Sequence, residues 1–241
     1  MRDLHVSSER VSLEGCALSV KAGEVIGLAG LDGSGQDLLT RACVGLKRPL
    51  GGQVLIGGQD LTGHHYRDYL AARVSFGAAG RLEEGLVSGL TLVEHFALAD
   101  PAQRGWINWE RAHQIATDRI DHYHIYGRPD SPIETLSGGN QQRVLMALMA
   151  AAPRLLVLEH PTRGLDVESA RWIWEQILAR RVDGTAILFT SADLDEIVTY
   201  SDRILVFYAG QVTEVPDARQ TSVDELGHLI GGQQVSKETP A

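Results

Sequence analysis

The sequence predicts an α/β fold built on a mainly parallel sheet. Residues 24–29, 155–158 and 185–190 are runs dominated by apolar side chains, which is typical of strands that are covered on both faces. The first run continues into a glycine-rich segment at residues 30–37, and residues 38–44 then favour a helix. A strand, a glycine-rich loop and a helix in this order form a common phosphate-binding unit.

Length and composition limit the number of domains and the kinds of partner. The 241 residues suit one sizeable domain, which we expect to span residues 1–241. The net charge of −9 comes from both signs scattered along the chain, and it argues against a nucleic-acid partner because such surfaces are normally basic. Cys16 and Cys43 have apolar neighbours in the sequence, as expected for reduced core residues of a cytosolic protein.

No segment predicts export or insertion into a membrane. Met1 is followed by residues of mixed polarity instead of a leader pattern. The longest apolar run, at residues 144–152, is too short to span a bilayer. If the chain works at a membrane, another chain must therefore hold it there.

Local patterns predict the other elements. The turn at residues 14–15 predicts short strands within residues 1–22, and paired glycines predict a small β-hairpin region at residues 49–61. The elements expected after it are a short helix at 64–72, a strand at 73–76, a helical subdomain at about 91–151, an amphipathic helix at 167–181 and a closing hairpin at 203–215. We expect the polar tail at about 232–241 to be disordered.

The glycine-rich segment departs from the usual phosphate-binding pattern Gly-x-x-x-x-Gly-Lys-Ser/Thr. Gln36 stands at the lysine position and Asp37 at the hydroxyl position. Losing a hydrogen bond to a charged group costs about 1.5–3 kcal/mol, and a carboxylate about 4 Å from a phosphate adds repulsion of about 4 kcal/mol before screening. We expect weak phosphate binding here. The candidate binding residues are Gly30, Gly33, Ser34, Gly35, Gln36 and Asp37.

A second candidate anion site begins at Ser137. Serine is a favoured helix N-cap, and Gly138 and Gly139 allow a close approach to the backbone. Residues 144–152, which Pro153 follows, predict a buried helix behind them. A hydroxyl, backbone N–H groups and the positive end of a helix together favour an anion. An ordinary capped core helix is the alternative interpretation.

The residues around this helix start resemble a known family. Residues 136–143 are Leu-Ser-Gly-Gly-Asn-Gln-Gln-Arg, and the run at 155–158 is followed by Glu159, His160 and then Pro-Thr-Arg-Gly-Leu-Asp at 161–166. These segments resemble the signature motif, Walker B strand and D-loop of ATP-binding cassette (ABC) domains, in the version found in bacterial importers of simple sugars and nucleosides. The resemblance implies a P-loop NTPase cassette with a small antiparallel β subdomain and a helical signature subdomain. It also implies ATP and Mg²⁺ as cofactors.

Several catalytic positions of that family are altered in this chain. Glu159 stands where an aspartate would hold the magnesium shell, and His160 stands where a glutamate would polarise water. Nearby phosphates would favour an imidazolium, which cannot accept a proton, and losing a working base costs about 10²–10⁴-fold in rate. The family's switch histidine is replaced by Ala192, and the loop at residues 77–82 lacks the family's glutamine.

Two ligand contacts of the family are also affected. No Phe, Trp or Tyr precedes Tyr66, so the ring that would stack on adenine is missing, and His5 is the only histidine within residues 1–22. Glu159 and Asp37 are the carboxylates that would ligate magnesium at this site. Together with the altered catalytic positions, these changes predict an ATP site that does not turn over efficiently.

The signature and the D-loop, in contrast, are intact. ABC domains pair head to tail, and the resemblance therefore assigns these residues to a nucleotide held by the partner. They are Ser137, Gly138, Gly139, Gln141 and Asp166. We expect a catalytically degenerate half that serves a second cassette with an intact Walker A motif. It would lie on the cytoplasmic face of the cell membrane with transmembrane permease subunits, and act indirectly with a substrate-binding protein.

Two other interpretations stay open from the sequence. One is a fully active homodimeric transport ATPase, against which the missing lysine at Gln36 speaks. The other is a soluble regulatory ABC protein without a permease. In importers of this kind two cassettes usually share one longer chain, so this chain also fits a separated second half. The sequence does not identify the transported substrate, because the permease and the binding protein select it.

Overall fold

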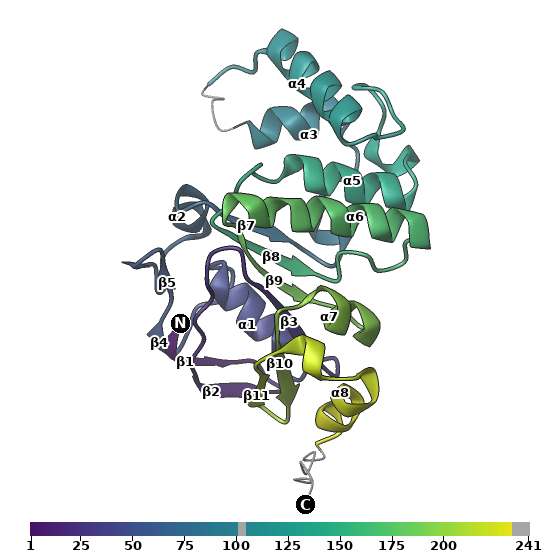
Figure 1. Ribbon diagram of the computed structural model, residues 1–241. Helices are drawn as coiled ribbons and strands as arrows, with labels where there is room; N and C mark the ends of the chain where they lie inside the picture. Colours follow the sequence, from purple (N-terminus) through teal and green to yellow (C-terminus); the bar gives the residue numbers. More distant parts are fainter. Residues whose placement is uncertain (101–104, 233–241) are drawn as a thin grey trace, which may run out of the picture. The chain divides into compact units, whose positions relative to one another are not determined.

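The computed structural model describes residues 1–100 and 105–232 (Figure 1). These residues form two compact units. The first contains residues 1–76, residues 152–160 and the chain from residue 179 onward, and the second contains residues 77–151 and 161–178. The predicted disordered tail lies outside the described residues, except for its first residue at 232.

A six-stranded sheet organises the first unit. Its strands are β3 (Val25–Gly30), β7 (Val74–Gly77), β8 (Leu155–Glu159), β9 (Ala186–Thr190), β10 (Arg203–Tyr208) and β11 (Gln211–Val215). Their order is β11-β10-β3-β9-β8-β7 (Figure 1). β10, β3, β9 and β8 pair in parallel, and β11 joins β10 antiparallel. Every residue of β8 and β9 is buried, so the predicted α/β fold with a mainly parallel core sheet is confirmed.

Short antiparallel strands form the small β subdomain of the same unit. They are β1 (Arg2–Ser7), β2 (Ser12–Cys16) and β4 (Gly51–Gln53) in the order β2-β1-β4, and the hairpin of β5 (Leu55–Ile56) and β6 (Gln59–Asp60). Gly52 has φ +82°, and a Cβ atom there would lie 2.1 Å from the carbonyl oxygen of Asp3. Only glycine fits this position, which lets β4 approach β1.

The helices of the first unit pack on the main sheet. They are α1 (Gln36–Cys43), α2 (Tyr66–Ala71), α7 (Leu194–Tyr200) and α8 (Val223–Ile230), with 3₁₀ turns at Arg180–Asp183 and Ala218–Gln220. α1 contacts β3, β8 and β9, whereas α8 contacts β10 and β3. The sequence analysis missed α8. Ser222 and Glu225 form a capping box at its start, and that spacing is a signal that could have found it.

Helices make up most of the second unit. They are a π-helical turn (Arg81–Gly85), α3 (Leu92–Ala99), α4 (Trp109–His122), a 3₁₀ turn (Ile133–Thr135), α5 (Gly138–Leu148) and α6 (Val167–Ala179), whose last residue passes the unit's boundary. The Thr91 side chain accepts a hydrogen bond from the backbone N–H of Glu94 and caps α3, and Asn108 caps α4. Each cap satisfies a backbone N–H group in the first turn of its helix.

The end of α5 differs from the expectation. The sequence predicts a helix through residue 152, but α5 ends at Leu148 and Met149 has an extended backbone with ψ 154°. Pro153 keeps the residue before it out of the helical region. The chain must also turn before β8 begins at Leu155, and an apolar run cannot reveal where that turn starts.

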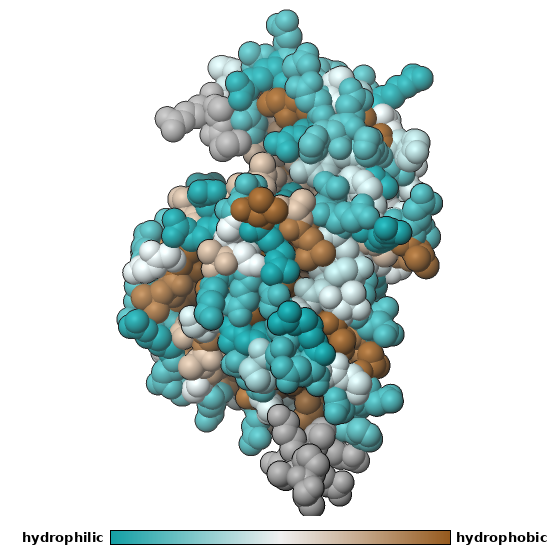
Figure 2. Space-filling view, viewed as in Figure 1, coloured by the Kyte–Doolittle hydropathy of each residue, from teal (hydrophilic) through white to brown (hydrophobic). Residues whose placement is uncertain are grey.

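The surface is mixed in polarity. The face in Figure 2 is mostly hydrophilic, with hydrophobic residues in small separate patches. This agrees with charges of both signs scattered along the chain. Among the helices of the described residues, none has the length and apolar character needed to cross a bilayer.

Two buried side chains of the first unit, the Cys43 thiol and the Tyr69 phenol, should make the fold less stable at alkaline pH. Burial raises the pKa of the Cys43 thiol to about 12, and burial raises the pKa of the Tyr69 phenol to about 12. In the unfolded chain these groups ionise near pH 8.5 and 10. The folded state therefore binds more protons above these values, and its stability falls as pH rises, by up to about 1.4 kcal/mol per pH unit for each group.

The measurement is urea unfolding at a series of pH values from 8 to about 11. We expect the midpoint to fall throughout this range, and to fall less steeply in Cys43→Ala because one of the two protons is removed. A midpoint that stays constant up to pH 11 would contradict the burial of both groups.

Candidate functional site

The glycine loop lies between β3 and α1 in the first unit. Gly30 ends β3, and Gln36 begins α1. Gly33 has φ +81° and Gly35 has φ +116°, and a Cβ atom on Gly35 would lie 2.8 Å from Leu13 Cδ2. These glycines are needed for the backbone conformation and for the close contact with β2. The predicted order of strand, glycine-rich loop and helix is thus confirmed, and phosphate binding by this loop stays a prediction.

Gln36 is buried inside this loop. Its Nε2 atom donates a hydrogen bond to the carbonyl oxygen of Leu31 at 3.3 Å. A Cβ atom on Gly30 would come within 2.5 Å of the same Nε2 atom, so the amide lies directly against the end of β3. Gln36 therefore bridges the loop internally, but it brings no positive charge to a phosphate.

Asp37 follows in the first turn of α1, where its own side chain is exposed. Its carboxylate interacts favourably with the positive end of the helix. The N-cap residue, Gly35, has no side chain that could satisfy the N–H groups of this turn. Asp37 therefore supplies negative charge to the same helix end that would attract a phosphate, and the two anions would repel each other.

Glu159 ends β8 and is buried within the first unit. Its Oε1 atom accepts a hydrogen bond from Thr40 Oγ1 at 3.0 Å, and its Oε2 atom forms an ion pair with Arg41 Nη2 at 3.3 Å. Both partners lie on α1, one turn beyond Asp37. A carboxylate that the sequence analysis assigned to magnesium is therefore already neutralised by a guanidinium.

These contacts decide how well the donor set fits Mg²⁺. A magnesium site normally uses one or two carboxylates together with water and phosphate oxygens. Glu159 could serve only after it separated from Arg41, and Asp37 has replaced the usual hydroxyl ligand. Within the described ranges, no cluster of three or more His, Cys, Asp or Glu side chains could hold a metal ion. The donor set thus does not fit the ion without rearrangement, and ligation by Glu159 and Asp37 stays a prediction.

The two remaining catalytic positions lie at the same edge of the parallel sheet. His160 follows β8 with φ +47°, and its backbone N–H donates to the carbonyl oxygen of Thr190 at 3.0 Å. Ala192 follows β9 by two residues, and Asp193 then caps α7. The structure therefore brings Glu159, His160 and Ala192 together at the carboxyl ends of neighbouring strands, where ligands of such sheets bind. The methyl side chain of Ala192 has no polar group that could contact a phosphate.

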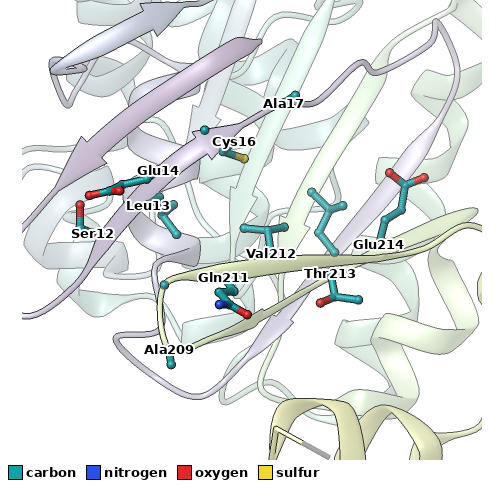
Figure 3. A pocket seen from close by; sticks show the side chains of 13 residues that line it. Ser12, Leu13, Glu14, Cys16, Ala17, Ala209, Gln211, Val212, Thr213 and Glu214 are labelled. Carbon is teal, nitrogen blue, oxygen red and sulfur yellow. The ribbon is translucent and has the colours of Figure 1, made fainter. Parts of the chain in front are cut away.

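A cavity of about 760 Å³ opens between β2 and the β10–β11 hairpin. Leu13, which packs against Gly35 of the glycine loop, lines it, and Figure 3 shows Leu13 and Val212 on its two sides. None of the thirteen lining residues is aromatic. His5 lies outside this set and forms an ion pair with Asp3. A base placed here would therefore meet aliphatic side chains and backbone but no stacking ring.

The second unit contains the intact signature. Ser137 is exposed at the N-cap of α5 and accepts hydrogen bonds from the backbone N–H of Asn140 at 3.4 Å and from its Nδ2 atom at 2.9 Å. Gln141, in contrast, is buried and donates to the carbonyl oxygens of Leu136 and Ile133. Gln141 therefore supports the turn before the helix from inside, and its role toward a partner's nucleotide stays a prediction.

The D-loop leads into α6 in the same unit. Asp166 accepts hydrogen bonds from the Ser169 backbone N–H at 2.9 Å and from Ser169 Oγ at 2.7 Å, and these bonds lower the pKa of its carboxyl group. Ser169 Oγ would lie 3.1 Å from a Cβ atom on Gly139. The start of α6, which holds Asp166 of the D-loop through Ser169, therefore lies close to the first turn of α5.

Sequence reasoning missed the arginines that contact these motifs. Arg41 pairs with Glu159 across 118 positions of the sequence, and Arg81 donates to the carbonyl oxygen of Arg163. A buried glutamate at the end of β8 was a signal for the first contact, because a buried carboxylate normally has a charged or hydrogen-bonding partner. No pattern in the sequence pointed to the contact of Arg81.

Comparisons with known proteins agree with this arrangement. The sequence profile of the family described as "ABC transporter" matches residues 13–163. The chain is 32% identical to the nucleoside import ATP-binding protein NupA of Lactococcus lactis, over 98% of this chain and 49% of that protein. It is 34% identical to the ribose import ATP-binding protein RbsA of Chromobacterium violaceum, over 94% of this chain and 46% of that protein. The chain thus spans about half the length of these curated relatives.

Solved structures show the same fold. An ATP-binding subunit of an ABC transporter has a TM-score of 0.78 and 24% identity, with coverage of 95% of this chain and 98% of that one. A dimeric ATP-binding cassette in a post-hydrolysis state, bound to ADP and Pi, has a TM-score of 0.74 and 23% identity, with coverage of 91% and 98%. Since the family profile covers the glycine loop, the signature helix and the end of β8 in this order, the chain belongs to the ABC transporter family and has the fold of its ATP-binding cassette.

Proposed function

We propose that this chain is the ATP-binding half of an importer for a simple sugar or a nucleoside, and that its own nucleotide site does not turn over ATP. The named functions of its relatives support the first part, and so does their length, which is about twice that of the matched region. The chain would then correspond to one of two cassettes.

The Arg41–Glu159 ion pair carries the second part of the proposal. A working site needs the Walker B carboxylate for the metal shell, but here both oxygens of Glu159 are engaged by α1. Gln36 adds no charge at the lysine position, and His160 and Ala192 stand at the positions of the general base and the switch histidine. Each change would remove a different contact to the phosphates of a nucleotide bound at this chain's own site, so together the changes should lower the rate of hydrolysis further than any one of them.

The role that remains for this chain is to cover the nucleotide of a partner cassette with its signature. Ser137 is exposed at the start of α5, where a hydroxyl and the helix N-terminus favour a phosphate. In head-to-tail pairs this surface would cover the γ-phosphate of ATP, with its Mg²⁺, on a partner cassette with an intact Walker A lysine. Permease subunits would hold the pair at the cytoplasmic face of the membrane, and a substrate-binding protein would deliver the cargo to them.

The isolated chain should therefore show negligible magnesium-dependent ATPase activity, even at high protein concentration. The missing base alone lowers the rate by about 10²–10⁴-fold, and Gln36→Lys should not restore turnover because His160 and Ala192 remain. Phosphate release with and without a lysine-bearing cassette is the measurement. Brisk turnover by the isolated chain that is lost in Glu159→Ala would instead support an active homodimer.

A further inference from the structure

Arg81 links two loops of the second unit that are far apart in the sequence. It begins the π-helical turn at Arg81–Gly85. Its Nη1 atom donates a hydrogen bond to the carbonyl oxygen of Arg163 in the D-loop at 2.9 Å. The bond spans 82 positions, so it exists only in the folded unit. π-helical turns often occur at functional sites.

The same guanidinium lies against the signature. A Cβ atom on Gly138 would lie 3.2 Å from Nη2 of Arg81, 3.6 Å from Cζ and 3.9 Å from Nε. These three distances place the flat group over the first residue of α5. A Cβ atom on Gly164, where φ is +71°, would lie 3.8 Å from the same Nη2 atom. Arg81 therefore contacts the D-loop and the signature at once. In each of the two loops a glycine, Gly164 or Gly138, lies next to the guanidinium.

The position is electrostatically unusual. A cation beside a helix N-terminus is opposed by the helix dipole, so the dipole does not hold Arg81 at Gly138. The hydrogen bond to Arg163 supplies a specific reason for the placement, because a guanidinium donates in a fixed planar geometry. An anion bound at this place would stabilise Arg81 beside Gly138, because its negative charge would offset the guanidinium and the positive end of α5.

We propose that Arg81 is a positioning residue that holds the D-loop and the signature loop as one surface for the partner cassette. The use of that surface rests on the proposed function, whereas the link itself belongs to this chain alone. Without Arg81, the segment at residues 161–166 would lose its tie to the turn at 81–85 and would sample more conformations. The signature would then meet a partner's nucleotide with its D-loop out of place.

Hydrogen exchange of the intact chain tests the link directly. In Arg81→Gln the amides of residues 162–166 should exchange about tenfold faster or more, because a hydrogen bond from a charged donor is lost, while the amides of the first unit's sheet keep their wild-type exchange rates. Arg81→Lys keeps one donor and should recover part of the protection. Arg171→Gln is the matched control: Arg171 is an exposed arginine on α6 that pairs with Glu175 one turn along the same helix, and its loss should leave the D-loop unchanged.

Unchanged exchange in Arg81→Gln would overturn the inference. In the assembled pair, Arg81→Gln should lower kcat at least about tenfold with KM for ATP unchanged, because the groups that bind ATP in the ground state lie on the partner. A large rise in KM with constant kcat would also overturn the positioning role. If the exchange result holds but Ser137→Arg leaves the activity of the pair intact, the proposed function fails and the link within this chain stands.

Discussion

Replacing Ser137 with arginine is expected to abolish ATP hydrolysis by the assembled pair of cassettes. The Ser137 hydroxyl lies exposed at the N-cap of α5, and we propose that it faces the terminal phosphate on the partner. Stabilising hydrogen bonds at such a centre need distances of about 2.7–3.1 Å, which an arginine side chain in this place would prevent. Losing one preorganised donor costs about 10²–10³-fold, so activity should fall below about 1% of wild type.

The same substitution also removes a helix cap, and a matched control separates the two effects. Ser222 caps α8 in the first unit with the same geometry, since its side chain accepts from the backbone N–H of Glu225. Ser222→Arg and Ser137→Arg should each lower stability by about 1 kcal/mol, but only the latter should abolish activity. Measured phosphate release within twofold of wild type in Ser137→Arg would contradict the assignment of the signature to a partner.

The sheet could be predicted from the sequence because its strands are buried on both faces. The runs at residues 155–158 and 185–190 have almost no polar positions, so they fit only strands at the centre of a covered sheet. The β10–β11 hairpin was also predicted from its glycine-containing turn, and in the structure Ala209 and Gly210 both adopt positive φ between the two strands. α8 and the end of α5 were harder, because capping and chain reversal leave weaker signals than long apolar runs.

The order of the site's motifs could also be predicted, but the contacts between side chains could not. The sequence places Gln36 at the lysine position and Glu159 at the end of a strand. It does not show that Arg41 reaches Glu159 or that Arg81 reaches Arg163, because each pair is joined only by the packing of distant segments. These contacts are the physical support for the two proposals, an ATP site that does not turn over and a D-loop held against the signature.

Replacing Arg41 with methionine should lower the free energy of unfolding by about 2–3 kcal/mol. The buried Glu159 would keep its hydrogen bond from Thr40 but lose its counter-ion. Breaking a fully buried pair costs about 3–5 kcal/mol, and solvent at Arg41, whose side chain is 35% exposed, reduces this value. Arg41→Met/Glu159→Gln should recover all but about 1 kcal/mol, since no unpaired charge remains. Urea unfolding of the four proteins gives the coupling energy.

The exposed pair of Arg171 and Glu175 provides the comparison for this cycle. Its side chains are 79% and 57% exposed, and Arg171→Met should therefore change stability by less than about 0.5 kcal/mol. A large coupling at Arg41–Glu159 would mean that the fold itself depends on the Walker B carboxylate being paired with α1, so that magnesium could be bound there only at the expense of stability. A coupling as small as that of the exposed pair would leave Glu159 free to serve a metal ion, and the main support for a degenerate site would be lost.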